Sequence, residues 1–178
     1  MNRRTPLLAL LCLPLLACSP TENRERPDTG LRQTVDTCPR GDTPEAVVCN
    51  FFQYTLTFSG LPTNAQQSTV SSSLSGELRS ALNQARAEPS LRTALQVRDS
   101  LFNSRFVRAE DFELGDVSAE AEDNVKIDIH FRQGEDRWHD TVELRRELRR
   151  LVLHDVHYRS ADEGTPPSLL ALLSTAAP

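Results

Sequence analysis

The sequence has few of the features that nucleic-acid binding or familiar catalysis requires. Its 178 residues include 25 acidic and 20 basic side chains, and Lys126 is the only lysine. Because phosphate neutralisation needs a concentrated basic face, this balance disfavours nucleic-acid binding. The sequence also has no glycine-rich phosphate loop, no Ser-His-Asp order typical of a hydrolase and no acidic metal cluster. No cofactor is expected.

A hydrophobic run long enough to cross a membrane is also missing. The uncharged stretch TPLLALLCLPLLA, residues 5–17, has about 13 residues, whereas a bilayer span needs roughly 20. Arg3 and Arg4 precede this stretch and the small residue Ala17 ends it. A basic start, a short apolar core and a small residue before a cleavage point predict a secretory signal peptide over residues 1–17.

The Leu-Leu-Ala-Cys order at residues 15–18 resembles the lipobox of bacterial lipoproteins. The resemblance implies that Cys18 is lipidated and begins the mature chain, and Ser19 after it implies sorting to the outer membrane. Several acyl chains anchor firmly, since each buried CH₂ contributes ~0.8 kcal/mol. In the alternative interpretation, the signal peptide is an ordinary one and Cys18 is not modified.

The polar residues after Cys18 contain proline and glycine and have no hydrophobic period, which is typical of a tether. We therefore divide the chain into a signal peptide (1–17), a lipidated cysteine with a flexible tether (18–41) and a single domain (42–178). The expected location is the periplasm, with the domain held at the outer membrane by Cys18.

Two further cysteines, Cys38 and Cys49, lie 11 residues apart. In an oxidising compartment such a pair predicts a disulfide, which would contribute roughly 2 to 3 kcal/mol. Two separate thiols are the alternative. A metal site is not expected, because further soft ligands are missing nearby.

Hydrophobic periodicity predicts three helices before residue 106. The first begins with Pro44, and Val47, Phe51, Tyr54 and Phe58 form its apolar stripe. LSGELRSALNQARAE and SLRTALQVRDSLF predict the second and third helices. A short helix or packed tail is expected around LLALL near the C-terminus.

The second half of the chain predicts strands. NVKIDIHF alternates between apolar and polar residues, as a half-buried strand does, and DFELGDVSAEA and RWHDTVEL flank it. TVELRRELRRLVL fits either a helix or a hairpin. We predict the hairpin, with a turn near RREL and with Arg145, Arg146, Arg149 and Arg150 in solvent. The expected fold is α+β, with N-terminal helices packed on a curved antiparallel four-stranded sheet and a short C-terminal helix.

Five short stretches, TPEAVVCNFFQYTL, LSGELRSAL, DSLFNS, VKIDIHF and LVLHDVHY, resemble a family of bacterial lipoproteins with a cystatin-like, nuclear transport factor two-like cone fold. Asp155, Val156 and Tyr158 match the last strand of that family, whereas Leu151, Leu153 and His154 depart from it. The resemblance implies a cone-like domain. Members of this broad group include immunity lipoproteins, which neutralise antibacterial effectors, and the superfamily also contains enzymes with a pocket inside the cone.

Histidines and carboxylates of the last strands are the candidates for chemistry. His154 and His157 are three residues apart in a strand, so we expect them on opposite faces and predict no shared metal. A possible pocket, of the kind that ketosteroid-isomerase-like enzymes use, comprises Tyr54, Asp140, Asp155 and His157. The alternative is a buried Asp155 with a structural role.

Acidic residues gather in the turns and could steer a basic partner, although such runs are usually only solvated. The possible partner-binding face comprises Glu120, Glu122, Asp123, Glu135 and Asp136. We predict a non-catalytic, lipid-anchored periplasmic module that binds another protein, in the sharper version an immunity protein against a secreted antibacterial effector. A small-ligand-binding or isomerase-like protein is the alternative.

Overall fold

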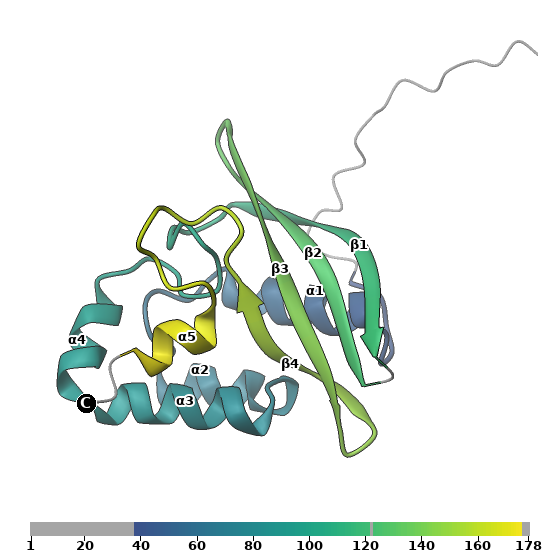
Figure 1. Ribbon diagram of the computed structural model, residues 1–178, viewed down its shortest axis with the longest axis horizontal. Helices are drawn as coiled ribbons and strands as arrows, with labels where there is room; N and C mark the ends of the chain where they lie inside the picture. The colour runs from purple at the N-terminus through teal and green to yellow at the C-terminus, as the bar shows by residue number, and fades with distance from the viewer. Residues whose placement is uncertain (1–37, 122, 176–178) are drawn as a thin grey trace, which may run out of the picture. The chain divides into compact units, whose positions relative to one another are not determined.

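A four-stranded antiparallel sheet with five α-helices makes up the described part of the computed structural model, residues 38–121 and 123–175 (Figure 1). The signal peptide, Cys18 and most of the tether expected from the sequence lie outside these residues. The elements are α1 (Pro44–Thr55), α2 (Asn64–Val70), the 3₁₀-helix η1 (Ser71–Ser73), α3 (Gly76–Ala87), α4 (Pro89–Gln96), β1 (Asp111–Ala121), β2 (Asn124–Gln133), β3 (Asp136–Glu147), β4 (Arg150–His157) and α5 (Leu169–Ser174).

The sheet is a meander in which each strand pairs with the next one in the chain, in the order β1-β2-β3-β4. This arrangement confirms the α+β class. The alternation in β2 also follows the prediction, because Ile127, Ile129 and Phe131 are buried while His130 is exposed. We call the face that carries these three apolar residues the inner face, and the opposite one the outer face.

Helix α1 packs against the inner face. Thr43 accepts a hydrogen bond from the amide of Ala46 and so caps the helix. Phe52 then contacts Phe131 of β2, with ring centroids 5.5 Å apart, and Phe112 of β1. These edge-on and tilted contacts fill the space between helix and sheet, and such aromatic pairs contribute about 0.5–1.5 kcal/mol beyond their buried area.

The predicted apolar stripe of α1 differs from the observed one at Tyr54. The side chains of Val48, Phe51 and Phe52 are at most 1% exposed, whereas Tyr54 is 55% exposed. Phe51 and Phe58 of the predicted stripe are buried and Val47 is partly buried, so the error is confined to Tyr54. Helix α2 was not predicted, because NAQQSTV has almost no apolar residues; it begins instead with a capping box between Thr63 and Gln66.

The ambiguous segment at residues 141–153 is a hairpin, as predicted. Glu147 pairs with Arg150, and Leu148 and Arg149 form the two-residue turn between them. Both turn residues have positive φ, 48° and 69°, as a type I′ turn requires. Asparagine and glycine are the usual residues there, so the turn had no sequence signal.

One extra residue interrupts the pairing of β4 with β3. Glu143 faces Asp155 and the next residue, Leu144, faces Leu153, so His154 lies between them in a β-bulge. The bulge shifts the alternation: Leu153 and Val156, three residues apart, both lie on the inner face and are fully buried. The change of face that the sequence shows near Asp155 therefore has a backbone cause.

Backbone hydrogen bonds also cover the free edge of β4, the side of the strand that does not pair with β3. Leu153 accepts a hydrogen bond from the amide of Ser75, just before α3. Further along, the amide of Tyr158 donates to the carbonyl of Pro167, before α5. In Figure 1, α3 and α5 lie on the β4 side of the sheet. Among the described residues, no helix is both long and apolar enough to span a membrane.

Replacing both turn residues, Leu148→Asn with Arg149→Gly, is expected to raise the free energy of unfolding by about 1–2 kcal/mol. Asparagine and glycine tolerate positive φ, whereas other L-residues pay roughly 1–2 kcal/mol there. Urea unfolding at neutral pH measures the change. Equal or lower stability in the double variant would contradict the turn geometry.

Candidate functional site

The four residues of the predicted pocket do not meet in one place. Tyr54 is largely exposed on α1, and each of the other three has a separate hydrogen-bonding role. The inner face, where the pocket was expected, carries fully buried side chains of Ile127, Ile129, Leu144 and Leu153. The sequence predicted Tyr54 on the buried side of α1. This prediction is wrong, because the side chain is 55% exposed.

Asp140 holds two irregular segments to β3. It is fully buried, and its two carboxylate oxygens accept hydrogen bonds from the amides of Ser104, at 2.8 Å, and Arg159, at 2.9 Å. Burial raises the pKa of Asp140, although these hydrogen bonds oppose the rise. The carboxylate therefore joins the loop before β1 to the chain after β4.

Asp155 has a similar role at the start of α5. One of its oxygens, Oδ1, accepts from the amides of Val156 and Leu170, at 2.8 and 2.9 Å. The side chain of Ser168 accepts from Ala171 in the same turn. Asp155 thus fixes the first turn of α5 to the bulge in β4, which is the structural role that the sequence left open as the alternative.

The tyrosine beside these carboxylates is Tyr158, not Tyr54. Its hydroxyl donates a 2.6 Å hydrogen bond to the carbonyl of Leu101, and its ring packs edge-on against Phe106. Burial first, and then the charges of Asp140 and Asp155, raise the pKa of Tyr158 well above its usual value. The hydroxyl therefore stays protonated and acts as a hydrogen-bond donor to the loop.

Three histidines, each on a different strand, lie on the outer face. His130 and His139 pair across β2 and β3, with ring centroids 5.9 Å apart. His157, opposite Thr141, lies on the same face. Gly115 in β1 leaves room for the His130 ring, because a Cβ there would lie 2.9 Å from His130 Nε2.

Glu143 is the centre of a polar group on this face. His157 Nε2 lies 2.9 Å from Glu143 Oε2, and Arg145 Nε donates to Glu143 Oε1 at 3.2 Å. Burial alone would raise the pKa of Glu143. The hydrogen bond from His157 and the charges of His154 and Arg145 outweigh burial and hold that pKa below its usual range. Glu143 is therefore a fixed negative charge at neutral pH.

His154, the extra residue of the bulge, lies near the polar group around Glu143. Its Nδ1 lies 3.2 Å from Ser75 Oγ, and its Nε2 lies 3.8 Å from Glu77. Burial, and then the charge of Arg145, lower the pKa of His154 although Glu143 and Glu77 oppose this. The expectation that His154 and His157 lie on opposite faces is wrong, because it assumed regular alternation and the bulge adds one residue between them.

The predicted acidic face is not a single surface. Asp123 lies in the β1–β2 turn, whereas Glu135 and Asp136 lie at the β2–β3 turn. β2 separates the two turns by its whole length of 10 residues, roughly 33 Å, and Figure 1 shows them at opposite ends of the strands. Glu122 and the side chain of Glu120 lie outside the described residues.

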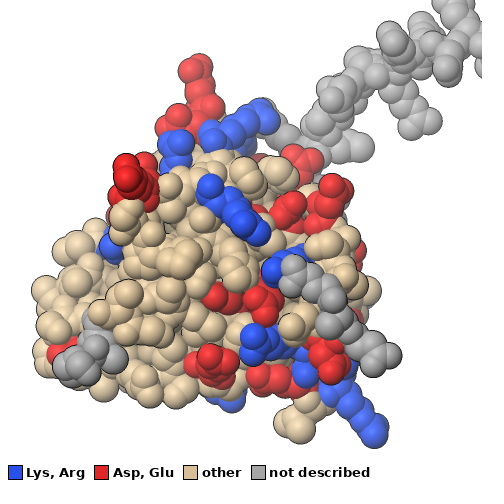
Figure 2. Space-filling model, in the orientation of Figure 1, with Lys and Arg blue, Asp and Glu red and all other residues tan. Residues whose placement is uncertain are grey.

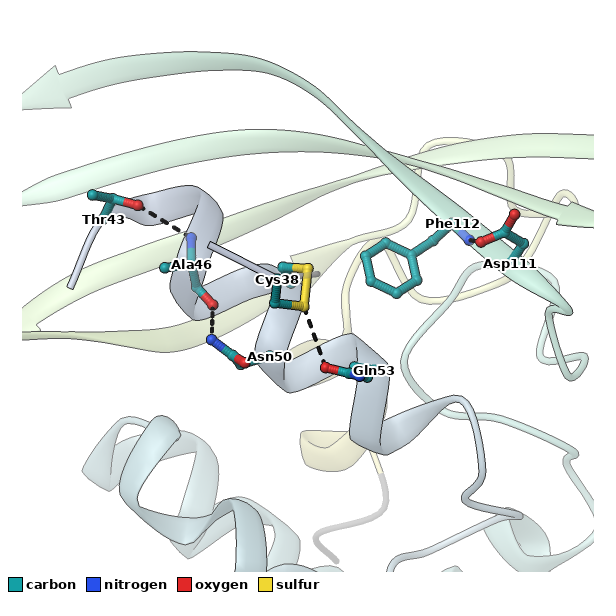
Figure 3. The surroundings of a disulfide bond; sticks show 8 residues. Cys38, Thr43, Ala46, Asn50, Gln53, Asp111 and Phe112 are labelled. Carbon is teal, nitrogen blue, oxygen red and sulfur yellow. Dashed lines mark hydrogen bonds between the residues drawn. A yellow bond between two sulfur atoms is a disulfide. The ribbon is translucent and has the colours of Figure 1, made fainter. Parts of the chain in front are cut away.

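The disulfide joins Cys38 to Cys49, in the middle of α1 (Figure 3). Their Cα atoms are 5.5 Å apart. Gln53, one turn further along α1, lies with its Oε1 3.3 Å from Cys38 Sγ. The bond fixes the chain before α1 along the side of the helix. Within the described ranges, no three His, Cys, Asp or Glu side chains are arranged to hold a metal ion.

The chain matched no protein-family model, no curated protein and no solved structure.

Replacing Asp155 by alanine is expected to lower the free energy of unfolding by roughly 2–4 kcal/mol, because two buried amides lose their acceptor. Asp155→Asn should cost only about 1 kcal/mol, since a single oxygen accepts both bonds. Urea unfolding measures both. Loss of biological function in a fully folded Asp155→Asn protein would instead support the isomerase-like alternative.

Stability is expected to fall as the pH is lowered from about 7.5 to 5. His154 has a lowered pKa in the fold and regains its ordinary value of about 6.5 on unfolding. Its contribution is present above that value and is lost as the pH falls through the folded pKa. His154→Gln should make the melting temperature less dependent on pH in this window, whereas the exposed control His130→Gln should not. The same pH dependence in His154→Gln as in the native sequence would contradict the role of His154.

Proposed function

We propose that this protein is a lipid-anchored periplasmic module that binds another protein through the outer face of its sheet, and that the partner is an antibacterial effector acting in the periplasm. The observation that carries the proposal is the ordered polar group on the outer face, comprising His130, His139, Glu143, Arg145 and His157. The lipobox-like sequence at Cys18 and the resemblance to immunity lipoproteins supply the location and the class of partner.

The outer face suits recognition because its polar side chains are held in place. Thr141 donates to Asp128 and accepts from Arg159, so the middle of the face is hydrogen-bonded from β2 to the chain after β4. Side chains that are already ordered lose less conformational entropy when a partner binds. This preorganisation favours a specific protein partner over a non-specific charged one.

The size of the face also supports a protein partner. Four strands spaced about 4.8 Å apart, with β2 roughly 33 Å long, give roughly 600 Å² in projection. Thr141, Glu143 and Asp155 on this face are buried, so an interface of the standard ~800 Å² on each partner would use the open part of the face together with its rim. In the view of Figure 2, both acidic and basic side chains lie over the right-hand part of the molecule, where Figure 1 shows the strands, which suits a partner with its own mixed charges.

The test is growth of a sensitive bacterial strain that exports to its periplasm, one at a time, each effector encoded beside the gene for this protein. The native chain should restore growth against one of them. The double variant His130→Glu/His139→Glu should bind that effector at least tenfold more weakly, because two negative charges are introduced on the outer face. Growth and the dissociation constant of the purified pair are measured together.

Glu135→Lys/Asp136→Lys is the matched control, because it also changes two exposed side chains but at the β2–β3 turn. It should protect fully. Failure of the native chain against every such effector would remove the immunity proposal. Loss of protection in the turn variant alone would place the interface at the acidic turn. A Cys18→Ala chain released into the soluble periplasm supports the anchor, whereas one that stays with the membrane contradicts it.

A further inference from the structure

The turn between β3 and β4 carries an exposed leucine among arginines. Leu148 is 97% exposed, and Arg146, Arg149 and Arg150 around it are exposed as well. We call these four residues the basic turn. In Figure 1 the turn projects beyond the other strand ends at the lower edge of the sheet, where Figure 2 shows projecting basic side chains. The core gains nothing from Leu148 in this position.

Glu147, the acidic residue within the turn, is bound to the start of α3. Both carboxylate oxygens of Glu147 accept from the amide of Gly76, at 3.3 and 3.1 Å, at the start of α3. Arg145 is engaged with Glu143 and Glu77. Among the described residues, Arg146, Arg149 and Arg150 form no ion pair. No ion pair with a described residue therefore neutralises these three arginines, although the carboxylates of Glu147 and of Asp42, which accepts from the amide of Leu151, lie beside the turn.

The backbone of the turn is unfavourable for the residues it carries. Leu148 and Arg149 have positive φ, where a side chain with a Cβ costs roughly 1–2 kcal/mol per residue. The chain thus holds a large aliphatic side chain and a guanidinium in a costly conformation, in solvent. Both residues lie exposed at the apex of the hairpin, where an approaching surface can reach them.

We propose that the basic turn binds the headgroup layer of an anionic lipid bilayer. Leu148 enters the interface, and the guanidinium groups pair with lipid phosphates, which arginine binds in a bidentate manner. A protein partner fits less well, because the four side chains of the basic turn offer far less than the ~800 Å² that a standard interface buries on each side. A bilayer needs no complementary shape, and its negative surface attracts each arginine near it.

This inference goes beyond the proposed function and does not require it. Binding of an effector uses the outer face, whereas the basic turn lies at the end of β3 and β4. If Cys18 is lipidated, about 20 residues join it to Cys38, with a root-mean-square span of roughly 25 Å when flexible. Such a link would keep the basic turn at high effective concentration near the bilayer, so that a weak contact suffices.

Hydrogen exchange of the full chain tests the proposal. The exchange rates of the backbone amides of residues 145–151 are measured under three conditions: without vesicles, with phosphatidylcholine vesicles, and with vesicles that also contain phosphatidylglycerol. Exchange in this segment should slow severalfold only with the anionic vesicles. Because the measurement is local, binding of the vesicles by the N-terminal segment does not imitate the result.

Two variants remove the basic turn in different ways. Arg149→Glu/Arg150→Glu should weaken partition onto the anionic vesicles at least tenfold, since two attractive charges become repulsive. Leu148→Asn/Arg149→Gly keeps or improves the turn geometry, and it should also lose the slowed exchange, so that loss of folding is not the cause. Val97→Ser and Arg92→Glu are the matched controls, because Val97 is 81% exposed and Arg92 is exposed on α4. Both should behave like the native chain.

Slowed exchange with both vesicle types, or with neither, would overturn the proposal. Slowed exchange with polyglutamate but not with anionic vesicles would also overturn it and would assign the basic turn to an acidic protein surface. The effector assay is independent. Slowed exchange with anionic vesicles but no protection against any effector would support this inference and contradict the proposed function. Protection without slowed exchange would support only the proposed function.

Discussion

The single extra residue in β4 determines what the end of this sheet can be. With regular alternation after Leu153, Asp155 and His157 would point into the core, and Val156 would point into solvent. Burying a carboxylate and an imidazole among apolar residues without partners would cost several kcal/mol. The bulge at His154 exchanges these positions. Val156 thereby joins the core. Asp155 can accept a hydrogen bond from the start of α5, and His157 lies beside Glu143.

Much of the sheet could be predicted because two-residue alternation is a strong signal when one face is buried. The pattern of β2 was sufficient by itself, and the sequence around Asp155 already showed a change of face. The turn at Leu148 and Arg149 gave no such signal, because its residues are unfavourable for the conformation they adopt. Helix α2 also gave none, since its stability comes from Thr63, Gln66 and tertiary contacts rather than from an apolar stripe.

The candidate site was less accessible from the sequence, for two physical reasons. The phase of α1 was not fixed by the sequence, because Phe51 and Phe52 are both buried and the contact of Phe52 with Phe131 leaves Tyr54 exposed. The polar group around Glu143 draws on β3, β4 and the start of α3, so no local window contains it. Glu143 alternates with the apolar Val142 and Leu144, so the sequence assigns it to the polar face of β3 but does not indicate its partners.

If the domain is anchored through its N-terminal segment, as proposed, the disulfide has a mechanical consequence. Tension on the chain before Cys38 passes through the sulfur atoms to Cys49, in the middle of α1, and bypasses the first turn of that helix. The load therefore acts across the helix that Phe51 and Phe52 hold against the sheet, and it must shear this packing rather than unwind the helix from its end. Reduction of the disulfide would move the point of loading to Thr43 and Pro44, where residues can be detached one at a time.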